Sequence, residues 1–384
     1  MELLYRTEGL LGELIGFPTV SADGNLDLIG WASNYLKGLG AVCDVSLDES
    51  GTKANLFASF GPEGDGGLVL SGHSDVVPVA DQEWSSDPFV MEDREGRLYG
   101  RGACDMKGFI ACVLALAPEI AQWPLKRPVH IVLTYDEEVG CFGARALVEE
   151  LRARELRPAT AILGEPTMMR VIDGHKGCFE YTTRITGCAG HGSAPDQGVN
   201  AAVCATRYAG RLMELEQDLR SRAPVDSPFT PPWTTLNIGR IQSGHAHNVI
   251  PDHAEIDWEM RPVQRADADH VLTEIDRYAA TLLPAMRAVH AEATITREVI
   301  GEVGGLHPVP HNAIAKIVSE LTGANGADVV AFGTEAGLFQ SLGMDCVVCG
   351  PGSIEQAHKP DEYVSRDQLA ACLEMLKGLE KHLT

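Results

Sequence analysis

Five segments of the 384-residue sequence place histidine or carboxylate side chains directly after an apolar run or in a glycine-rich loop. The candidates are His73 in SGHSDVVP, Asp105 in YGRGACDMKG, Glu137 and Glu138 in TYDEEVG, Glu165 in LGEPT, and His358 in GSIEQAHKPDE. Imidazole and carboxylate groups suit Zn²⁺, Co²⁺ or Mn²⁺, and a carboxylate can bridge two ions. Two histidines and several carboxylates without cysteine therefore predict a bimetallic hydrolytic centre.

The elements that must position these side chains follow from the spacing of apolar residues. Helical patterns cover residues 3–15, 27–38, 106–122 and 143–154, and strand-like runs cover residues 55–60, 68–71, 129–135 and 161–163. This alternation predicts a mixed, mainly parallel sheet sandwiched by helices. Ligands bind such sheets at the carboxyl ends of the strands, so the candidate side chains should converge there.

The middle third of the chain has a different order of elements. Its patterns predict βαββαβ over residues 178–186, 200–219, 234–241, 253–261, 267–283 and 291–299. That order is typical of a ferredoxin-like α+β unit. The α/β pattern then returns, with helices at 313–322 and 366–382 and a strand at 346–349. We therefore predict a discontinuous catalytic domain, residues 1–177 plus 299–384, and an inserted domain, residues 178–298.

The charge balance limits the classes of partner. The chain has 31 Lys and Arg against 54 Asp and Glu, a net charge of -23, which repels nucleic acid and anionic lipid. Its longest apolar run, residues 109–117, is shorter than the roughly 20 residues that span a bilayer. The first twenty residues do not have the pattern of a signal peptide. We expect a cytoplasmic enzyme with no nucleic-acid or membrane partner.

Three other motifs do not support a second kind of site. Cys346 and Cys349 form a CxxC, but residues three apart on a strand point to opposite faces. The pair His245 and His247 has no carboxylate companion. The segment that begins at Gly100 resembles a dinucleotide loop, yet Asp105 takes the place of its third glycine.

Over essentially its whole length the chain resembles the M20-type di-metal aminoacylases and peptidases, and among them most of all the acetylornithine deacetylases. The motifs that carry the resemblance, in order, are SGHSDVVPV, YGRGACDMKGFIA, TYDEEVGCFGAR, GEPT, HGS, NVIP, GTEAGLFQ and GPGSIEQAHKPDEYV. The resemblance implies a zinc-exopeptidase-like fold with an inserted lid and dimerisation domain.

The resemblance also assigns the metal ligands. It gives one ion to His73 and Glu165, the other to Glu138 and His358, and makes Asp105 the bridging carboxylate. The implied cofactors are two divalent ions, with Zn²⁺ as the first choice and Co²⁺ or Mn²⁺ as alternatives.

Two neighbours of the ligands have further expected roles. Asp75 is placed to accept the second ring N–H of His73 and so to fix its tautomer. Glu137 resembles the general base that takes a proton from metal-activated water and passes it to the leaving amine.

The inserted domain matches three more family positions. His191 corresponds to the histidine that stabilises the tetrahedral oxyanion, commonly in the site of the partner subunit. Asn248 and Arg261 correspond to substrate-binding residues, and a guanidinium group can bind an α-carboxylate through two hydrogen bonds. The resemblance therefore implies a homodimer formed through the inserted domain.

The implied activity is removal of the acetyl group from N2-acetyl-L-ornithine, which gives acetate and L-ornithine for arginine biosynthesis. Glu165 favours deacylation, because a Glu in the GEPT motif goes with aminoacylases and carboxypeptidase-like members. The alternatives are a succinyl-diaminopimelate desuccinylase and a broad N-acyl amino acid hydrolase or carboxypeptidase. A non-catalytic scaffold is disfavoured because all seven expected positions, namely the five ligands, Asp75 and the base Glu137, carry suitable residues. Cys104 departs from the small residues common beside the bridging carboxylate, which suggests an oxidant-sensitive site.

Overall fold

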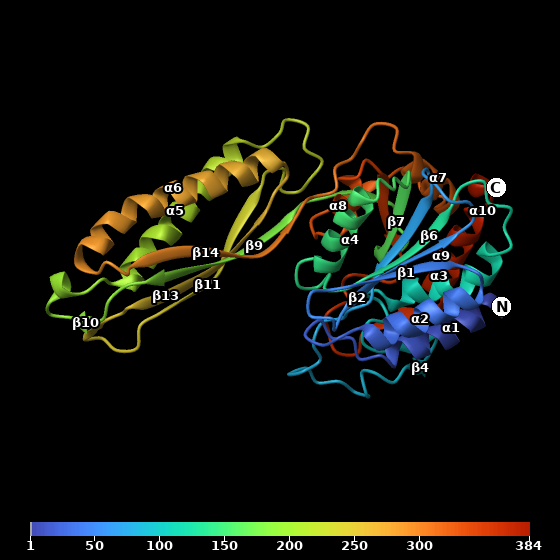
Figure 1. The fold of residues 1–384 in the computed structure, drawn as a ribbon, viewed down its shortest axis with the longest axis horizontal. Helices are drawn as coiled ribbons and strands as arrows, with labels where there is room; N and C mark the ends of the chain where they lie inside the picture. Colours follow the sequence, from blue (N-terminus) through green and yellow to red (C-terminus); the bar gives the residue numbers. More distant parts are fainter. Residues whose placement is uncertain (1) are drawn as a thin grey trace. The chain divides into compact units, whose positions relative to one another are not determined.

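An eight-stranded sheet forms the centre of the larger of two units in the computed structural model, which describes residues 2–384 (Figure 1). Unit 1 comprises the chain up to Gly174, Leu306–Val329 and Thr334–Thr384. The strand order is β1-β2-β6-β3-β7-β16-β8-β15. The strands are β1 (Val42–Leu47), β2 (Ala54–Phe60), β3 (Leu68–His73), β6 (Val129–Thr134), β7 (Thr160–Pro166), β8 (Ile172–His175), β15 (Asp328–Val330) and β16 (Asp345–Gly350).

The four central strands, β6, β3, β7 and β16, are parallel. Strand β2 pairs antiparallel with β1 and β6, and β8 pairs antiparallel with β16. Every residue of β3 and β6 is buried. A strand covered on both faces has no solvent-facing positions, which explains the continuous apolar runs in the sequence. The mainly parallel central sheet between helices is confirmed.

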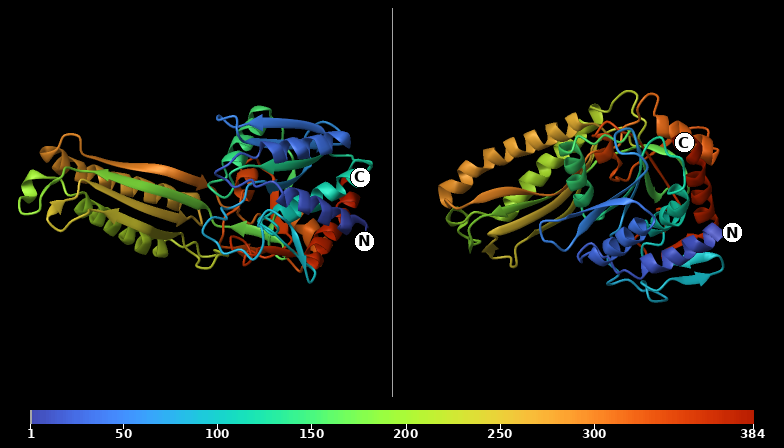
Figure 2. Two further views of the ribbon diagram at one scale, coloured as in Figure 1. Left: turned by 90° about the horizontal axis from the view of Figure 1, so that it is seen from below. Right: turned by 45° about the vertical axis from the view of Figure 1, so that its right-hand side comes forward.

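Helices cover both faces of this sheet, as Figures 1 and 2 show within unit 1. One face carries α3 (Lys107–Ile120), packed against α1 (Glu2–Ile15) and α9 (Arg366–Gly378), together with α2 (Leu26–Gly38) and α7 (Ala313–Thr322). The other face carries α4 (Phe142–Ala153) and α8 (Ala336–Gln340). The chain ends in α10 (Glu380–Leu383). A separate three-stranded sheet joins β4 (Glu92–Arg94), β5 (Arg97–Tyr99) and β17 (Tyr363–Ser365).

Unit 2, His175–Gly305 with Val330–Gly333, contains a four-stranded antiparallel sheet in the order β11-β13-β9-β14. Its strands are β9 (Cys178–Thr186), β11 (Thr235–Ser243), β13 (His253–Arg261) and β14 (Thr294–Val303). The helices α5 (Ala201–Ser221) and α6 (Arg265–Val289) pack on one face of the sheet. A short ladder joins β10 (Gly190–His191) to β12 (Val249–Ile250), and a single 3-10 turn covers Pro195–Gln197.

Among the helices of residues 2–384, none combines the length and the apolar character that a membrane-spanning segment requires.

Candidate metal centre

Five of the predicted side chains gather in unit 1, where parallel strands end. His73 is the last residue of β3, and Glu165 is the second-last residue of β7. Glu138 follows β6, and His358 lies in the loop that follows β16. Asp105 comes from the turn before α3. Adjacent parallel strands bring their carboxyl ends to one edge of a sheet, so residues more than 280 positions apart become neighbours.

The carboxylate of Asp105 lies between the two histidines. Its Oδ1 atom is 3.0 Å from Nε2 of His73, and its Oδ2 atom is 3.3 Å from Nε2 of His358. Each oxygen therefore faces a different imidazole. A carboxylate in this position has the geometry required to bridge two cations.

A glutamate accompanies each histidine. Oε2 of Glu165 is 4.0 Å from Nε2 of His73, and Oε2 of Glu138 is 3.0 Å from Nε2 of His358. Ligand atoms of His73, Asp105 and Glu138 all lie within 4.8 Å of one another, which is a group able to hold a metal ion. Glu165 thus lies beside His73, and Glu138 lies beside His358.

The buried carboxylates give this centre a negative charge that bound cations would balance. Burial raises the pKa of Glu165 well above its usual value, and repulsion from Asp105 raises it further. Burial opposes ionisation of Asp105 too, but hydrogen bonds from His358 and His73 lower its pKa below the usual range. Hydrogen bonds to Asp105 and Glu138 raise the pKa of His358 to about 10. Several buried carboxylates around two imidazoles form an anionic N/O donor set that fits Zn²⁺, Co²⁺ or Mn²⁺.

Asp75 holds the segment that carries the predicted base. Its Oδ1 atom accepts the backbone N–H of Glu137 at 3.0 Å, and its Oδ2 atom accepts the N–H of Glu138 at 3.3 Å and the hydroxyl of Ser21 at 2.6 Å.

The contact of Asp75 with His73 differs from the expected one. The backbone carbonyl of Asp75 lies 2.9 Å from Nδ1 of His73, whereas the carboxylate lies at 3.7 Å. Because the carbonyl only accepts, Nδ1 carries the proton and Nε2 faces Asp105.

Glu137 has no ion-pair partner among residues 2–384. Burial raises its pKa well above the usual value, and repulsion from Glu165 adds to the effect. A carboxylate that is not neutralised by a fixed cation remains able to accept a proton.

Sequence reasoning overlooked the buried carboxylate of Glu335, at the start of α8. It is 2% exposed, accepts the hydroxyl of Thr134 at 3.0 Å, and burial raises its pKa to about 7. The motif GTEAGLFQ could have indicated this residue, because in it an acidic residue immediately precedes an apolar helical turn.

The three remaining predicted residues all lie in unit 2. His191 and Asn248 are adjacent because β10 pairs with β12, and the N–H of Gly192 donates to the carbonyl of Asn248 at 2.8 Å. His191 is exposed, and its Nδ1 atom is 2.7 Å from the hydroxyl of Ser193. Arg261 ends β13, outside that ladder, and pairs with Glu259 at 2.6 Å.

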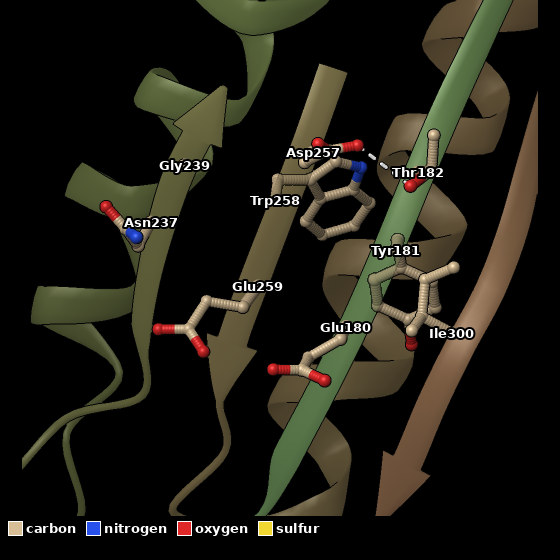
Figure 3. A pocket seen from close by; sticks show the side chains of 9 residues that line it. All are labelled: Glu180, Tyr181, Thr182, Asn237, Gly239, Asp257, Trp258, Glu259 and Ile300. Carbon is tan, nitrogen blue, oxygen red and sulfur yellow. Dashed lines mark hydrogen bonds between the residues drawn. The ribbon is translucent and has the colours of Figure 1, made fainter. Parts of the chain in front are cut away.

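The open face of the unit 2 sheet carries an acidic pocket of 470 Å³, whose lining side chains include Glu180, Asp257 and Glu259 (Figure 3). Cys178 joins Glu180 and Glu259 in a second group with metal-ligand spacing. Glu259 already pairs with the guanidinium of Arg261, so this group is less anionic than the centre in unit 1.

The cysteines do not form a reactive cluster at the centre. Cys104 is fully buried, its thiol donates to the carbonyl of Ser353 at 3.2 Å, and burial together with Glu362 raises its pKa. The thiolate is the reactive form, so the expected oxidant sensitivity has no basis in this geometry. Cys346 and Cys349 are buried in β16.

The chain is similar to known proteins in both sequence and fold. The family model described as Peptidase family M20/M25/M40 matches residues 69–381. An acetylornithine deacetylase of Shigella sonnei is 36% identical over 358 residues, which cover 91% of each chain.

Solved structures share the fold. A metallo-carboxypeptidase of the M20 family from Sulfolobus solfataricus superposes with a TM-score of 0.75 at 18% identity, covering 99% of each chain. A dinuclear metal binding peptidase of the same family from Bacillus subtilis superposes with a TM-score of 0.66 at 16% identity, covering 100% of this chain and 99% of that chain.

Proposed function

The chain belongs to the peptidase family M20/M25/M40, and on this premise we propose that it removes the acetyl group from N2-acetyl-L-ornithine. Family membership makes it a hydrolase that acts on amide bonds. The observation that carries the choice of substrate is the 36% identity, over 91% of both chains, to the acetylornithine deacetylase. Arginine biosynthesis, and with it a cytoplasmic location, are part of the proposal.

We assign one divalent ion to His73 and Glu165, the other to Glu138 and His358, and both to Asp105. The two oxygens of Asp105, at 3.0 and 3.3 Å from the two imidazoles, support this assignment. Zn²⁺ is the proposed metal, with Co²⁺ and Mn²⁺ as chemically suitable substitutes. Bound divalent ions lower the pKa of water and polarise the carbonyl of the scissile amide.

Glu137 is the proposed general base. Its carboxylate accepts the proton of the attacking water and returns it to the nitrogen of the leaving amine. Asp75 fixes the backbone of Glu137 and Glu138 through two hydrogen bonds, so base and ligand keep a constant relative position.

Unit 2 supplies the proposed substrate contacts. His191 stabilises the oxyanion, Asn248 binds the substrate, and the guanidinium of Arg261 binds the α-carboxylate. Arg261 would exchange its present partner, Glu259, for the substrate.

We also propose a homodimer formed through unit 2. Its edge strand β11 carries the exposed Ile241, and the groove between β11 and α5 contains Met213, which is 64% exposed. Light scattering should give twice the mass of the 41.3 kDa chain, and Met213→Glu should shift the protein towards the monomer. A monomeric wild-type protein would contradict the proposal.

The test of the proposed activity compares kcat/KM for N2-acetyl-L-ornithine and N-succinyl-LL-diaminopimelate on Zn²⁺-loaded or Co²⁺-loaded protein. A preference of at least a hundredfold for acetylornithine, about 2.7 kcal/mol of transition-state discrimination, supports the proposal. The reverse preference would identify a desuccinylase. Turnover of neither, with hydrolysis of amides that carry bulky acyl groups, would identify a broad acylase or carboxypeptidase.

A further inference from the structure

A buried ion pair outside the proposed ligand set joins Arg101 to Glu362 in unit 1. The side chains are each 1% exposed, and Nη1 of Arg101 lies 2.8 Å from Oε2 of Glu362. Burying two opposite charges costs desolvation free energy, which is offset only when further hydrogen bonds satisfy both groups. The surroundings supply such bonds to the carboxylate and to both terminal nitrogens of the guanidinium, and only Nε of Arg101 is left without a partner among the described residues. These bonds lead to two metal ligands.

The carboxylate of Glu362 binds the turn that carries Asp105. Its Oε1 atom accepts the backbone N–H of Cys104 at 2.8 Å and that of Asp105 at 3.0 Å. Its Oε2 atom accepts the N–H of Gly102 at 3.0 Å. These three hydrogen bonds from main-chain N–H groups fix the backbone from which the proposed bridging carboxylate projects.

The guanidinium of Arg101 binds the segment that carries His358. Nη1 also donates to the carbonyl of Lys359 at 3.3 Å, and Nη2 donates to Oε1 of Gln82. Nε2 of Gln82 in turn donates to the carbonyl of His358 at 3.0 Å. The ring of Trp84 stacks 4.9 Å from the guanidinium carbon.

His358 needs this support more than the other histidine does. His73 lies within a buried central strand and is 1% exposed. His358 lies in an irregular loop, has a left-handed backbone with φ of 61°, and its side chain is 52% exposed. The metal position formed by Asp105, Glu138 and His358 therefore depends on where a loop holds its ligand. In the other metal position, His73 and Glu165 lie on strands.

We propose that the Arg101–Glu362 pair is the positioning element for the second metal position, the one formed by Asp105, Glu138 and His358. By joining the turn of Asp105 to the loop of His358, the pair holds Oδ2 of Asp105 and Nε2 of His358 within 3.3 Å. The position of His73 and Glu165 does not require it. This inference rests on the proposed function, since it presupposes two bound ions.

The test is a Co²⁺ titration of the full chain, followed by calorimetry and by the visible absorption of the bound ion. Arg101→Met removes the guanidinium and with it the ion pair, and leaves a shorter, unbranched apolar side chain. Loss of a group that orients ligands costs about 10- to 100-fold in metal affinity. We expect the dissociation constant of the weaker ion to rise at least tenfold and that of the tighter ion to change less than threefold.

The matched control is Arg366→Met. Arg366 also forms an ion network in unit 1, with Glu8 and Asp93 at 2.7 Å each, but neither of these two residues belongs to a proposed ligand segment. The Arg366→Met variant should bind both ions with the same affinities as the wild-type chain. If Arg101→Met does not fold, as judged by circular dichroism, Gln82→Ala replaces it. That variant keeps the Arg101–Glu362 ion pair and removes the bonds that link Gln82 to Arg101, to Trp84 and to the carbonyl of His358.

The outcomes separate the inference from its premise. A wild-type chain that binds fewer than two ions overturns the proposed di-metal site itself. A wild-type chain that binds two ions, with variants of Arg101 or Gln82 that bind both equally well, overturns only the positioning role. Equal weakening of both ions, or the same weakening in Arg366→Met, also overturns it, because the effect would then be general loss of structure.

Discussion

Acidification should destabilise the protein through one buried imidazole, that of His130 in β6. The residue is 3% exposed, its ring lies 4.7 Å from the ring of Phe57, and its Nδ1 atom is 2.8 Å from the hydroxyl of Ser59. Its Nε2 atom is buried and has no hydrogen-bond partner among the described residues. Burial disfavours the protonated form and lowers the pKa of His130 from 6.5 to about 4.

The sign and size of the effect follow from proton linkage. Between pH 6.5 and 4 the unfolded chain binds a proton at this residue and the folded chain does not, so stability falls as the pH falls. The contribution of neutral His130 is complete above pH 6.5. At about 1.4 kcal/mol per pKa unit, the loss on reaching pH 4 is about 3 kcal/mol.

The assay compares urea unfolding of wild-type protein and His130→Phe from pH 8 to 4, in the presence of a chelator. Phenylalanine keeps the ring contact with Phe57 and does not titrate. Since the two chains share every other titratable group, the difference between their free energies of unfolding isolates His130. That difference should be constant above pH 7 and should shift by about 3 kcal/mol in favour of the variant near pH 4. A constant difference down to pH 4 would refute the reasoning.

Three further substitutions, the last with a control variant, test other parts of the account. Glu137→Gln should lower kcat by about 10²-fold or more while two ions stay bound, so a variant that retains over a tenth of the wild-type kcat in steady-state assays contradicts the assigned base. Asp75→Asn should lower activity about 10- to 100-fold, because the side-chain amide keeps a single acceptor oxygen and its NH₂ cannot accept the second of the two backbone N–H groups of residues 137 and 138. Unchanged kinetics would argue against this role. Gly164→Ala would bring a Cβ atom to 1.8 Å from the ring of Phe109 and should lower the free energy of unfolding by about 1–3 kcal/mol or more. The control is Gly210→Ala, which has open space around the added Cβ atom and should not lower the free energy of unfolding.

The sequence predicted the centre of the fold because burial leaves a strong pattern. The strands β3 and β6 are buried at every position, so they appear as continuous apolar runs of strand length. Weakly buried elements were missed. The edge strand β1 has mixed polarity and is mostly exposed, and α8 has only five residues, too few for a helical repeat. The predicted helix 366–382 is interrupted at Leu379, between α9 and α10.

The site was predictable in its residue types but not in its bonds. His73 and Glu165 could be placed because each ends an apolar strand run. No local pattern indicates that Glu362 binds main-chain N–H groups near Asp105, because those contacts join loops 257 or more positions apart. Which atom of Asp75 faces His73 depends on backbone geometry that residue types do not encode.

Anomalous diffraction at the zinc absorption edge, from crystals of Zn²⁺-loaded protein, tests the central claim most directly. The account predicts two peaks in unit 1, one beside His73 and Glu165, the other beside Glu138 and His358, each in contact with one oxygen of Asp105. A single peak, or a strong peak at Cys178, Glu180 and Glu259 with none at Asp105, would contradict it.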